Sequence, residues 1–512
     1  MKDRYDVVII GSGLGGLISA NILAREGYTV CVLEKNNQYG GNLQTFVRDK
    51  TIFDTGVHYI GGLSEGQNLY QYFKYLDILD DLNLKKMDED GFDIITFGND
   101  QTEYKHAQGY QNFAETLIDQ FPEEEKAIKS YCAKLKETCN QFPLYHLKHG
   151  KPYIENLELF EESAKEYIES LTTNKKLISV LSGSNLLYAG DGKTTPFYVH
   201  ALSVNSYIES AYRCVNGGSQ ISKALIRKLK KFGGEAYKYK EVVAFNFDDK
   251  EIVSVTTKDG KEIKGTTFIS NVDPKLTLKL IGGQKLRKSY INRVQNIESV
   301  ISTFSLYIVL KPNTFKYRNK NYYHFKGENS IWTAQDYTQE SWPEAYMVSM
   351  GVKKDTDQWG ESITAMTYMN YDEVIPWENT FNTVAHKNDR GQTYEEFKAQ
   401  KAEAFIKEIE KKFPEIRSCI QEVYTSTPLS YRDYIGNNRG AAYGYVKDVN
   451  NPLKSFVSPR TKIKNLLFTG QSLNMHGILG VTISAVITSS ELVGREYLLN
   501  KILESNKEKD PQ

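Results

Sequence analysis

Six residues near the N-terminus have the types and spacing needed to hold a pyrophosphate. Gly11-Ser12-Gly13-Leu14-Gly15-Gly16 matches the pattern GxGxxG. In such a turn Gly11 allows the tight bend, Gly13 lets the backbone approach the pyrophosphate, and Gly16 lets the following helix pack closely on a strand. The free N–H groups at the start of that helix then bind the phosphates. The motif therefore predicts a dinucleotide-binding turn.

The elements around this motif are those that the chemistry requires. Residues 5–10 form a short apolar run typical of a buried parallel strand, 14–26 have helical spacing, and 29–33 are again strand-like. Glu34 follows the second strand, where a carboxylate can accept hydrogen bonds from ribose hydroxyls. Because strand, helix, strand and acidic residue occur in that order, an ordinary glycine turn is disfavoured.

After Lys35, a second glycine pair is followed by Asn42, and here the chain resembles a known superfamily. Gly40-Gly41 after an acidic residue resembles the FAD-dependent amine oxidases, phytoene desaturases and retinol saturases. The resemblance implies that FAD is the cofactor and that these glycines place backbone amides beside its diphosphate. Segments 217–243, 268–274 and 467–482 resemble further FAD-contacting pieces. Motif and resemblance together assign to FAD the residues Gly11, Ser12, Gly13, Leu14, Gly15, Gly16, Glu34, Lys35, Gly40, Gly41, Asn42, Val243, Gly470, Gln471, Gly480 and Thr482.

Within that superfamily, segments 53–61, 431–434 and 440–444 are most similar to the retinol saturase and carotenoid isomerase branch. This similarity implies a lipophilic polyene substrate and reduction of a C=C bond, with hydride from reduced FAD and a proton from an acid. His58, Tyr59 and His476 lie in segments that the resemblance places at the flavin, so they are the candidate proton donors.

Other activities fit the same motifs. The chemistry could run in reverse as a desaturase, although Asn42 stands where desaturases and amine oxidases commonly carry Arg. It could also be a cis/trans isomerisation or an amine oxidation. A lipid-binding escort protein without redox chemistry is a further alternative, disfavoured by the intact GxGxxG motif and Glu34. No second GxGxxG follows a strand, so an external electron donor or acceptor is expected.

Composition limits the class of protein. Lys+Arg 64 against Asp+Glu 64 leaves no net charge, which argues against nucleic acid as a partner. The five scattered cysteines and the start of the chain predict a cytoplasmic protein. No stretch supplies the ~20 apolar residues of a spanning helix, while peripheral membrane contact stays open. His146 and His149 lack partners at ligand spacing, so no metal site is expected.

We therefore predict an α/β fold built from discontinuous segments. A Rossmann-type FAD-binding domain, with a mainly parallel sheet and a small antiparallel meander, is expected from residues 1–75, 205–290 and 455–512. A mixed α+β substrate-binding domain is expected from 76–204 and 291–454. The meander should turn at Asp248-Asp249 and at Asp259-Gly260.

Overall fold

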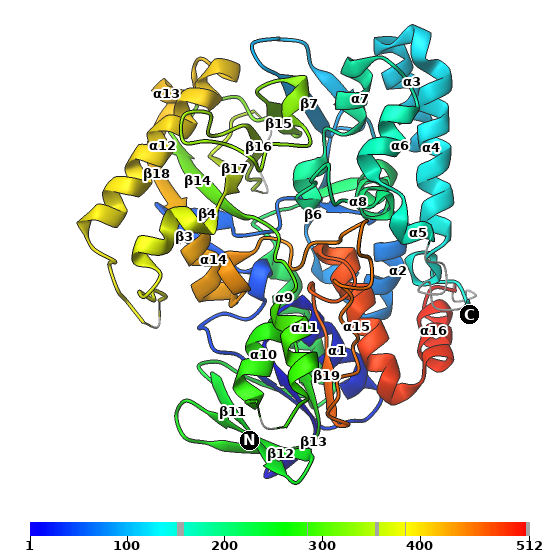
Figure 1. Cartoon of the computed structure of the whole chain (residues 1–512), viewed down its shortest axis with the longest axis vertical. Helices are drawn as coiled ribbons and strands as arrows, with labels where there is room; N and C mark the ends of the chain where they lie inside the picture. The colour runs from blue at the N-terminus through cyan, green and yellow to red at the C-terminus, as the bar shows by residue number, and fades with distance from the viewer. Residues whose placement is uncertain (151–157, 284, 354–357, 385, 508–512) are drawn as a thin grey trace.

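Two seven-stranded sheets and a layer of helices make up the protein. The computed structural model describes residues 1–150, 158–283, 285–353, 358–384 and 386–507. One sheet, which includes the antiparallel meander, lies at the bottom of the view in Figure 1, and the other sheet lies at the top. The C-terminal helices α15 (Gly477–Val493) and α16 (Arg495–Glu504) run beside the lower half.

The first sheet is the predicted Rossmann-type sheet. Its order is β10-β2-β1-β13-β12-β11, and β19 pairs with β13. The pairs that join β10, β2, β1, β13 and β19 are parallel, whereas β13, β12 and β11 form an antiparallel meander, as predicted. The strands are β1 (Arg4–Ile10), β2 (Val30–Leu33), β10 (Glu235–Tyr237), β11 (Val242–Asp248), β12 (Glu251–Thr257), β13 (Glu262–Ser270) and β19 (Leu466–Phe468).

Helix α1 (Leu14–Arg25) joins β1 to β2 and is almost entirely buried. It packs between α15 and α9 (Ser219–Lys231), so it has no solvated face for charged residues. This explains why its sequence is apolar on every side rather than amphipathic. The predicted strand–helix–strand unit is confirmed to within one residue at each end.

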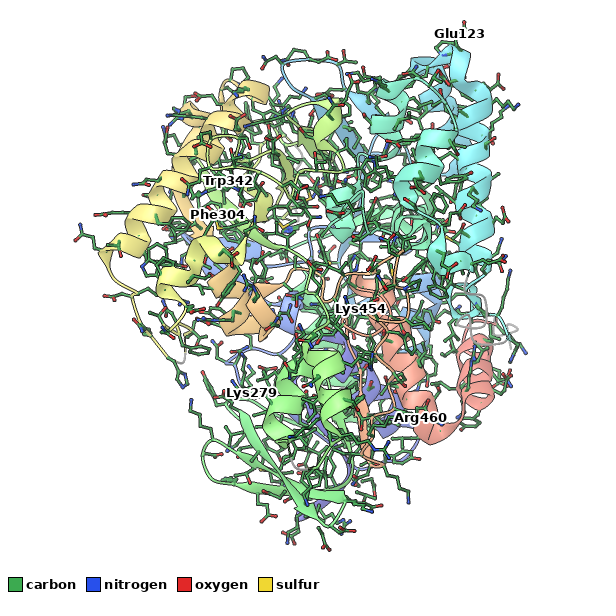
Figure 2. The ribbon with its side chains drawn as sticks, viewed as in Figure 1. Glu123, Lys279, Phe304, Trp342, Lys454 and Arg460 are labelled. Atoms are coloured by element: carbon green, nitrogen blue, oxygen red, sulfur yellow. The ribbon has the colours of Figure 1, made fainter. Side chains whose placement is uncertain are left out.

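The second sheet has the order β18-β14-β17-β16-β15-β7-β8. Its pairs are antiparallel except for β15 with β7, which are parallel. Figure 2 labels Phe304 and Trp342, whose rings meet edge to face with centroids 5.6 Å apart, where the sheet packs on α12 (Gln392–Lys412). The strands are β7 (Asp93–Phe97), β8 (Tyr104–His106), β14 (Ser302–Leu310), β15 (Asn321–Phe325), β16 (Ala345–Met350), β17 (Ser362–Met369) and β18 (Ile420–Ser426).

The remaining elements cover the sheets and connect them. Small sheets are formed by β3 (Thr45–Arg48) with β4 (Thr51–Asp54), and by β5 (Ile60–Gly61), β9 (Ala211–Cys214) and β6 (Leu84–Lys86). The other helices are α2 (Asn68–Tyr75), α3 (Tyr110–Gln120), α4 (Glu125–Asn140), α5 (Glu158–Glu161), α6 (Ala164–Ser170), α7 (Lys175–Leu181), α8 (Phe197–Glu209), α10 (Pro274–Ile281), α11 (Lys288–Gln295), α13 (Ile416–Cys419) and α14 (Pro428–Ile435).

The two sheets draw on different parts of the chain. All strands of the first sheet come from the segments predicted to bind FAD, and all strands of the second come from the segments predicted to bind substrate. The division of the chain into two domains at those boundaries stays a prediction. Among the described residues, no helix is both long enough and apolar enough to cross a membrane.

Candidate active site

A long cavity runs from the carboxyl ends of β1 and β2 to the face of the second sheet. Ligands bind at this edge of open α/β sheets because the loops that follow the strands meet there. At the first end the cavity is lined by residues 10–15, 33–36 and 40–43. At the other end it is lined by Leu186, Leu187, Thr303, Tyr323, Met347, Met366 and Tyr443. We call this space the flavin cavity.

The glycine turn has the geometry that the motif predicts. Gly11 has a φ of +91°, and a Cβ placed on Gly16 would lie 2.3 Å from the carbonyl oxygen of Gly11. A Cβ on Gly13 would lie 2.6 Å from Nδ2 of Asn271, at the cavity wall. No side chain caps the start of α1. The backbone N–H groups at the start of α1 are therefore not covered by a side chain and can bind a diphosphate in the cavity.

Glu34 is held in one orientation beside this turn. Its Oε2 accepts hydrogen bonds from the backbone N–H of Ser12, at 3.1 Å, and from the Ser12 hydroxyl. Its Oε1 accepts from the N–H of Asn36 at 2.8 Å. A carboxylate offers about four lone-pair directions, so acceptor capacity remains toward the cavity that Glu34 lines. The position fits the two hydroxyls of a ribose.

The second glycine pair lies against the first turn. Gly40 forms a β-bridge with Gly13, and a Cβ on Gly41 would lie 3.1 Å from the Cα of Gly13. Asn42 lines the cavity next to them. Two stretches of backbone without side chains thus lie side by side on the cavity wall, where a diphosphate can approach both. Lys35 also lines the cavity, but its Nζ donates to the carbonyl oxygen of Asp433 at 2.7 Å, joining the turn to α14.

Three residues predicted to contact the cofactor do not line the flavin cavity. Val243 is 41% exposed and points away, while Val242 lines the cavity, because successive side chains of a strand face opposite sides. Gly480 and Thr482 are absent from the wall of this cavity: a Cβ on Gly480 would meet Met475 at 2.7 Å, and Thr482 donates to the Ile478 carbonyl within α15. Gly470 and Gln471 do line the cavity, as do Gly477, Ile478 and Val481.

A hydrogen-bonded chain of tyrosines ends at the wall of the flavin cavity. The hydroxyls of Tyr59 and Tyr323 are 2.7 Å apart, and the Tyr59 hydroxyl lies 2.8 Å from Oδ2 of Asp93. Asn321 Nδ2 donates to Oδ1 of Asp93 at 2.8 Å, and the buried Arg213 donates to Oδ1 of Asn321 at 2.9 Å. The parallel register of β15 and β7 places Asn321 opposite Asp93.

The protonation state of Asp93 sets the direction of this chain. Burial raises the pKa of the Asp93 carboxyl to about 7. When Asp93 is ionised it accepts from Tyr59, which then accepts from Tyr323. When Asp93 is protonated it donates to Tyr59, Tyr59 donates to Tyr323, and the Tyr323 hydroxyl is free to donate into the cavity. The chain can therefore present a proton at a defined point on the wall.

The two predicted histidines line the flavin cavity as well. Burial lowers the pKa of His58 and of His476 to about 4, so both are neutral at neutral pH. His476 Nε2 lies 3.0 Å from the carbonyl oxygen of Leu187. His58 has no hydrogen-bond partner within the described part of the chain. Its ring is therefore available to a ligand, and its role as proton donor stays a prediction, as do those of Tyr59 and His476.

The residues that complete this wall have no motif in the sequence. Asp93, Tyr323 and Thr303 belong to strands of the second sheet, and Tyr323 is 264 residues from Tyr59. The Thr303 hydroxyl is buried without a hydrogen-bond partner among the described residues. A bound ligand or an ordered water could supply the missing partner. These residues could have been predicted only from information on contacts between distant parts of the chain.

The bare glycine turn, the oriented Glu34 and a cavity that continues to the second sheet fit FAD. The fold and site thus define a Rossmann-type flavoprotein, an FAD-dependent oxidoreductase. The family model for flavin containing amine oxidoreductases matches residues 14–367. The chain belongs to this family.

Relatives with known names agree with that assignment. The chain is 27% identical to all-trans-retinol 13,14-reductase of Rattus norvegicus, over 97% of this chain and 86% of the relative. It is 25% identical to prolycopene isomerase 1, chloroplastic, of an Oncidium hybrid cultivar, over 95% and 83%. Cyclohexylamine oxidase from Brevibacterium oxydans IH-35A shares the fold, with a TM-score of 0.57 and 13% identity over 96% and 99% of the two chains.

Proposed function

We propose that this protein reduces a C=C bond of a lipophilic polyene, in the manner of a retinol saturase. The observation that carries the proposal is the chain Asp93–Tyr59–Tyr323, which ends on an otherwise apolar part of the flavin cavity. Leu187, Met347 and Met366 line that part. The names of the relatives, a retinol reductase and a prolycopene isomerase, point to the same class of substrate.

In this proposal the residues on the cavity wall have different roles in the reaction. Bound FAD, once reduced, supplies the hydride. The protein holds the double bond against the apolar wall, excludes water, and delivers a proton from the Tyr323 hydroxyl to the other carbon. Tyr59 then returns a proton to Tyr323, and Asp93 returns one to Tyr59. Thr303 supplies a hydroxyl for orientation, and His58 a neutral N–H group.

The electrons come from outside the chain in this proposal. An external donor reduces the flavin between turnovers, and the lipophilic substrate is the second partner. We place the protein in the cytoplasm, with peripheral contact to a membrane as the route by which an insoluble substrate arrives. Nucleic acid has no part in the proposal.

The test is oxidation of the reduced flavin by candidate substrates. The flavin is photoreduced without oxygen and mixed with a retinoid, a carotenoid or a polyene fatty acid, and the return of the oxidised flavin spectrum is followed. Faster reoxidation with one class, and a product with one fewer double bond, supports the proposal. Reoxidation by imines or oxygen alone favours an amine oxidase. A geometric isomer without net reoxidation favours an isomerase, and flavin reduction by a more saturated polyene favours a desaturase.

The rate of this step should fall as pH rises above about 7. The Tyr323 hydroxyl can donate into the cavity only when Asp93 is protonated, and burial raises the pKa of Asp93 to about 7. Above that pH the protonated fraction decreases about tenfold per unit. The groups that interact with Asp93 are Tyr59, Tyr323, Tyr207, Asn321 and Arg213. Stopped-flow measurement from pH 6 to 9 checks this.

The matched variant for the pH dependence is Asp93→Asn, which retains the shape of the side chain but does not titrate. Its rate should be lower and independent of pH over the same range. If Asp93→Asn kept the inflection of the unmodified protein, another group would control the reaction.

A further inference from the structure

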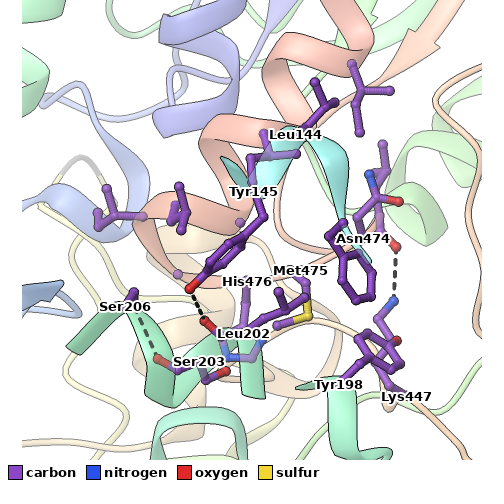
Figure 3. A pocket seen from close by; sticks show the side chains of 18 of the residues that line it. Leu144, Tyr145, Tyr198, Leu202, Ser203, Ser206, Lys447, Asn474, Met475 and His476 are labelled. Atoms are coloured by element: carbon purple, nitrogen blue, oxygen red, sulfur yellow. Dashed lines mark hydrogen bonds between the residues drawn. The ribbon is translucent and has the colours of Figure 1, made fainter. Parts of the chain in front are cut away.

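A second cavity adjoins the flavin cavity. Its volume is about 690 Å³, within the usual range for ligand pockets. It lies between α15, α8 and residues 142–145. It shares Leu187, Tyr207, His476, Gly477 and Ile478 with the flavin cavity, so the two spaces meet at the start of α15 and beside α8. Figure 3 shows its wall, with Met475 and His476 between α8 and the loop that carries Lys447.

Most of this wall is apolar. Leu144, Leu202, Met475, Ile483 and Ile487 line it. The three side chains from the C-terminal segment, Met475, Ile483 and Ile487, are only partly buried although they face the interior of the fold. Their exposed surface is the surface of the cavity. An apolar ligand would remove that surface from water, which stabilises the complex by roughly 25 cal/mol per Å².

One charged side chain interrupts the apolar wall. The Nζ of Lys447 donates to the carbonyl oxygen of Leu473 at 3.0 Å. No carboxylate of the described residues forms an ion pair with it. Burial lowers the pKa of Lys447 to about 8, so the ammonium form still dominates at pH 7. An ammonium has three N–H donors, and one of them is used. The remaining donors have no ion-pair partner among the described residues. Lys447 is half-buried and lines both this cavity and a smaller, more polar one that Asp191 and Glu298 also line.

The other charged residues that line the cavity do not form an ion pair with Lys447. Arg460 and Glu491 form an ion pair with each other, and Arg495 lies close by at the end of α15. Figure 2 shows Arg460 beside the lower end of α15. A ligand that satisfies the site must therefore bring its own negative charge to Lys447 and place apolar atoms along the rest of the wall.

We propose that this cavity binds a long-chain carboxylate, with the carboxylate on Lys447 and the chain along Met475, Ile483 and Ile487. A carboxylate accepts the unused donors in charge-assisted hydrogen bonds, which are about twice as strong as those between neutral groups. The inference is independent of the proposed reaction, because a saturated acid has no double bond to reduce. Failure of one would leave the other intact.

Titration calorimetry on the flavin-loaded protein tests this with decanoate and with decan-1-ol, which has the same chain and no charge. Lys447→Met should weaken decanoate binding by about tenfold to a hundredfold, the effect of losing a hydrogen bond between charged groups. Lys447→Arg should retain binding within about threefold. The affinity for decan-1-ol should change by less than about threefold in both. Lys193→Met, at an exposed lysine, is the matched control.

A second variant locates the ligand without touching the charge. Ile483 lines this cavity and is not part of the flavin cavity wall, so Ile483→Trp should abolish decanoate binding and leave FAD content unchanged. Equal decanoate affinity in the unmodified protein and in Lys447→Met, absence of binding, or full binding in Ile483→Trp would overturn the inference. If Lys447→Met did not fold, the result for Ile483→Trp would decide by itself.

Discussion

Glu34→Ala should yield a protein that is purified without its yellow colour. The Glu34 carboxylate is fixed by Ser12 and Asn36 and faces the flavin cavity. In the predicted complex this carboxylate accepts hydrogen bonds from the two ribose hydroxyls, and each hydrogen bond to a charged group contributes about 1.5 kcal/mol or more. FAD affinity should therefore fall by about a hundredfold or more. The absorbance ratio of flavin to protein, followed by titration of the apoprotein with FAD, measures the change.

Glu251→Ala is the control for this experiment, because Glu251 lies on the exposed end of the meander, far from the flavin cavity. It should bind FAD as the unmodified protein does. Equal flavin content in Glu34→Ala and the unmodified protein would show that FAD is not held at this turn. Gly13→Leu offers an independent check, because its side chain would occupy the space where the diphosphate approaches.

Tyr323→Phe should slow the oxidation of reduced flavin by a polyene by about a hundredfold to ten-thousandfold, the range for loss of a general acid. The substitution removes the hydroxyl at the end of the chain, on the cavity wall, and leaves the ring in place. FAD content and reoxidation by oxygen should not change, since neither needs this proton. Anaerobic stopped-flow spectroscopy measures the difference.

Tyr207→Phe is the matched control for the tyrosine chain. The Tyr207 ring lies against Tyr59 with centroids 4.3 Å apart and lines the same cavity, but its hydroxyl is not part of the chain. Its rate should stay within about threefold. If Tyr323→Phe were equally mild and His58→Gln were severe, the proton donor would be His58, and the tyrosine chain would have a structural role.

The cofactor turn was determined by local sequence. Gly11, Gly13, Gly16 and Glu34 are close in the chain, and each is required by backbone geometry or hydrogen bonding within one strand–helix–strand unit. Such a unit fixes its own geometry, so the turn and the direction of α1 could be predicted. The meander was predictable for the same reason, because its two turns carry their own sequence signals.

The predicted cofactor residues that do not line the flavin cavity lie where local sequence no longer determines which side chains face it. Val242 lines the cavity and Val243 does not, because the register of the strand decides which of two neighbouring side chains faces the cavity. Gly480 lies on α15, where a Cβ would meet Met475 at 2.7 Å, so packing within the segment already requires a glycine. A glycine in a family-like segment can thus serve either a ligand or a neighbouring side chain, and only the packed structure distinguishes the two.

The proton chain and the half-buried lysine were decided by tertiary structure alone. Tyr59, Asp93 and Tyr323 come together because β7 and β15 pair in parallel across more than two hundred residues, and pairing at that distance leaves no periodicity in the sequence. Lys447 in the sequence is one lysine among many. Its significance comes from the apolar wall and from the lack of an ion-pair partner among the described residues, which are properties of its surroundings. The sequence by itself determined the glycine turn and the acidic residue predicted to bind the cofactor, because these are local features, and the packing of distant segments decided what surrounds them.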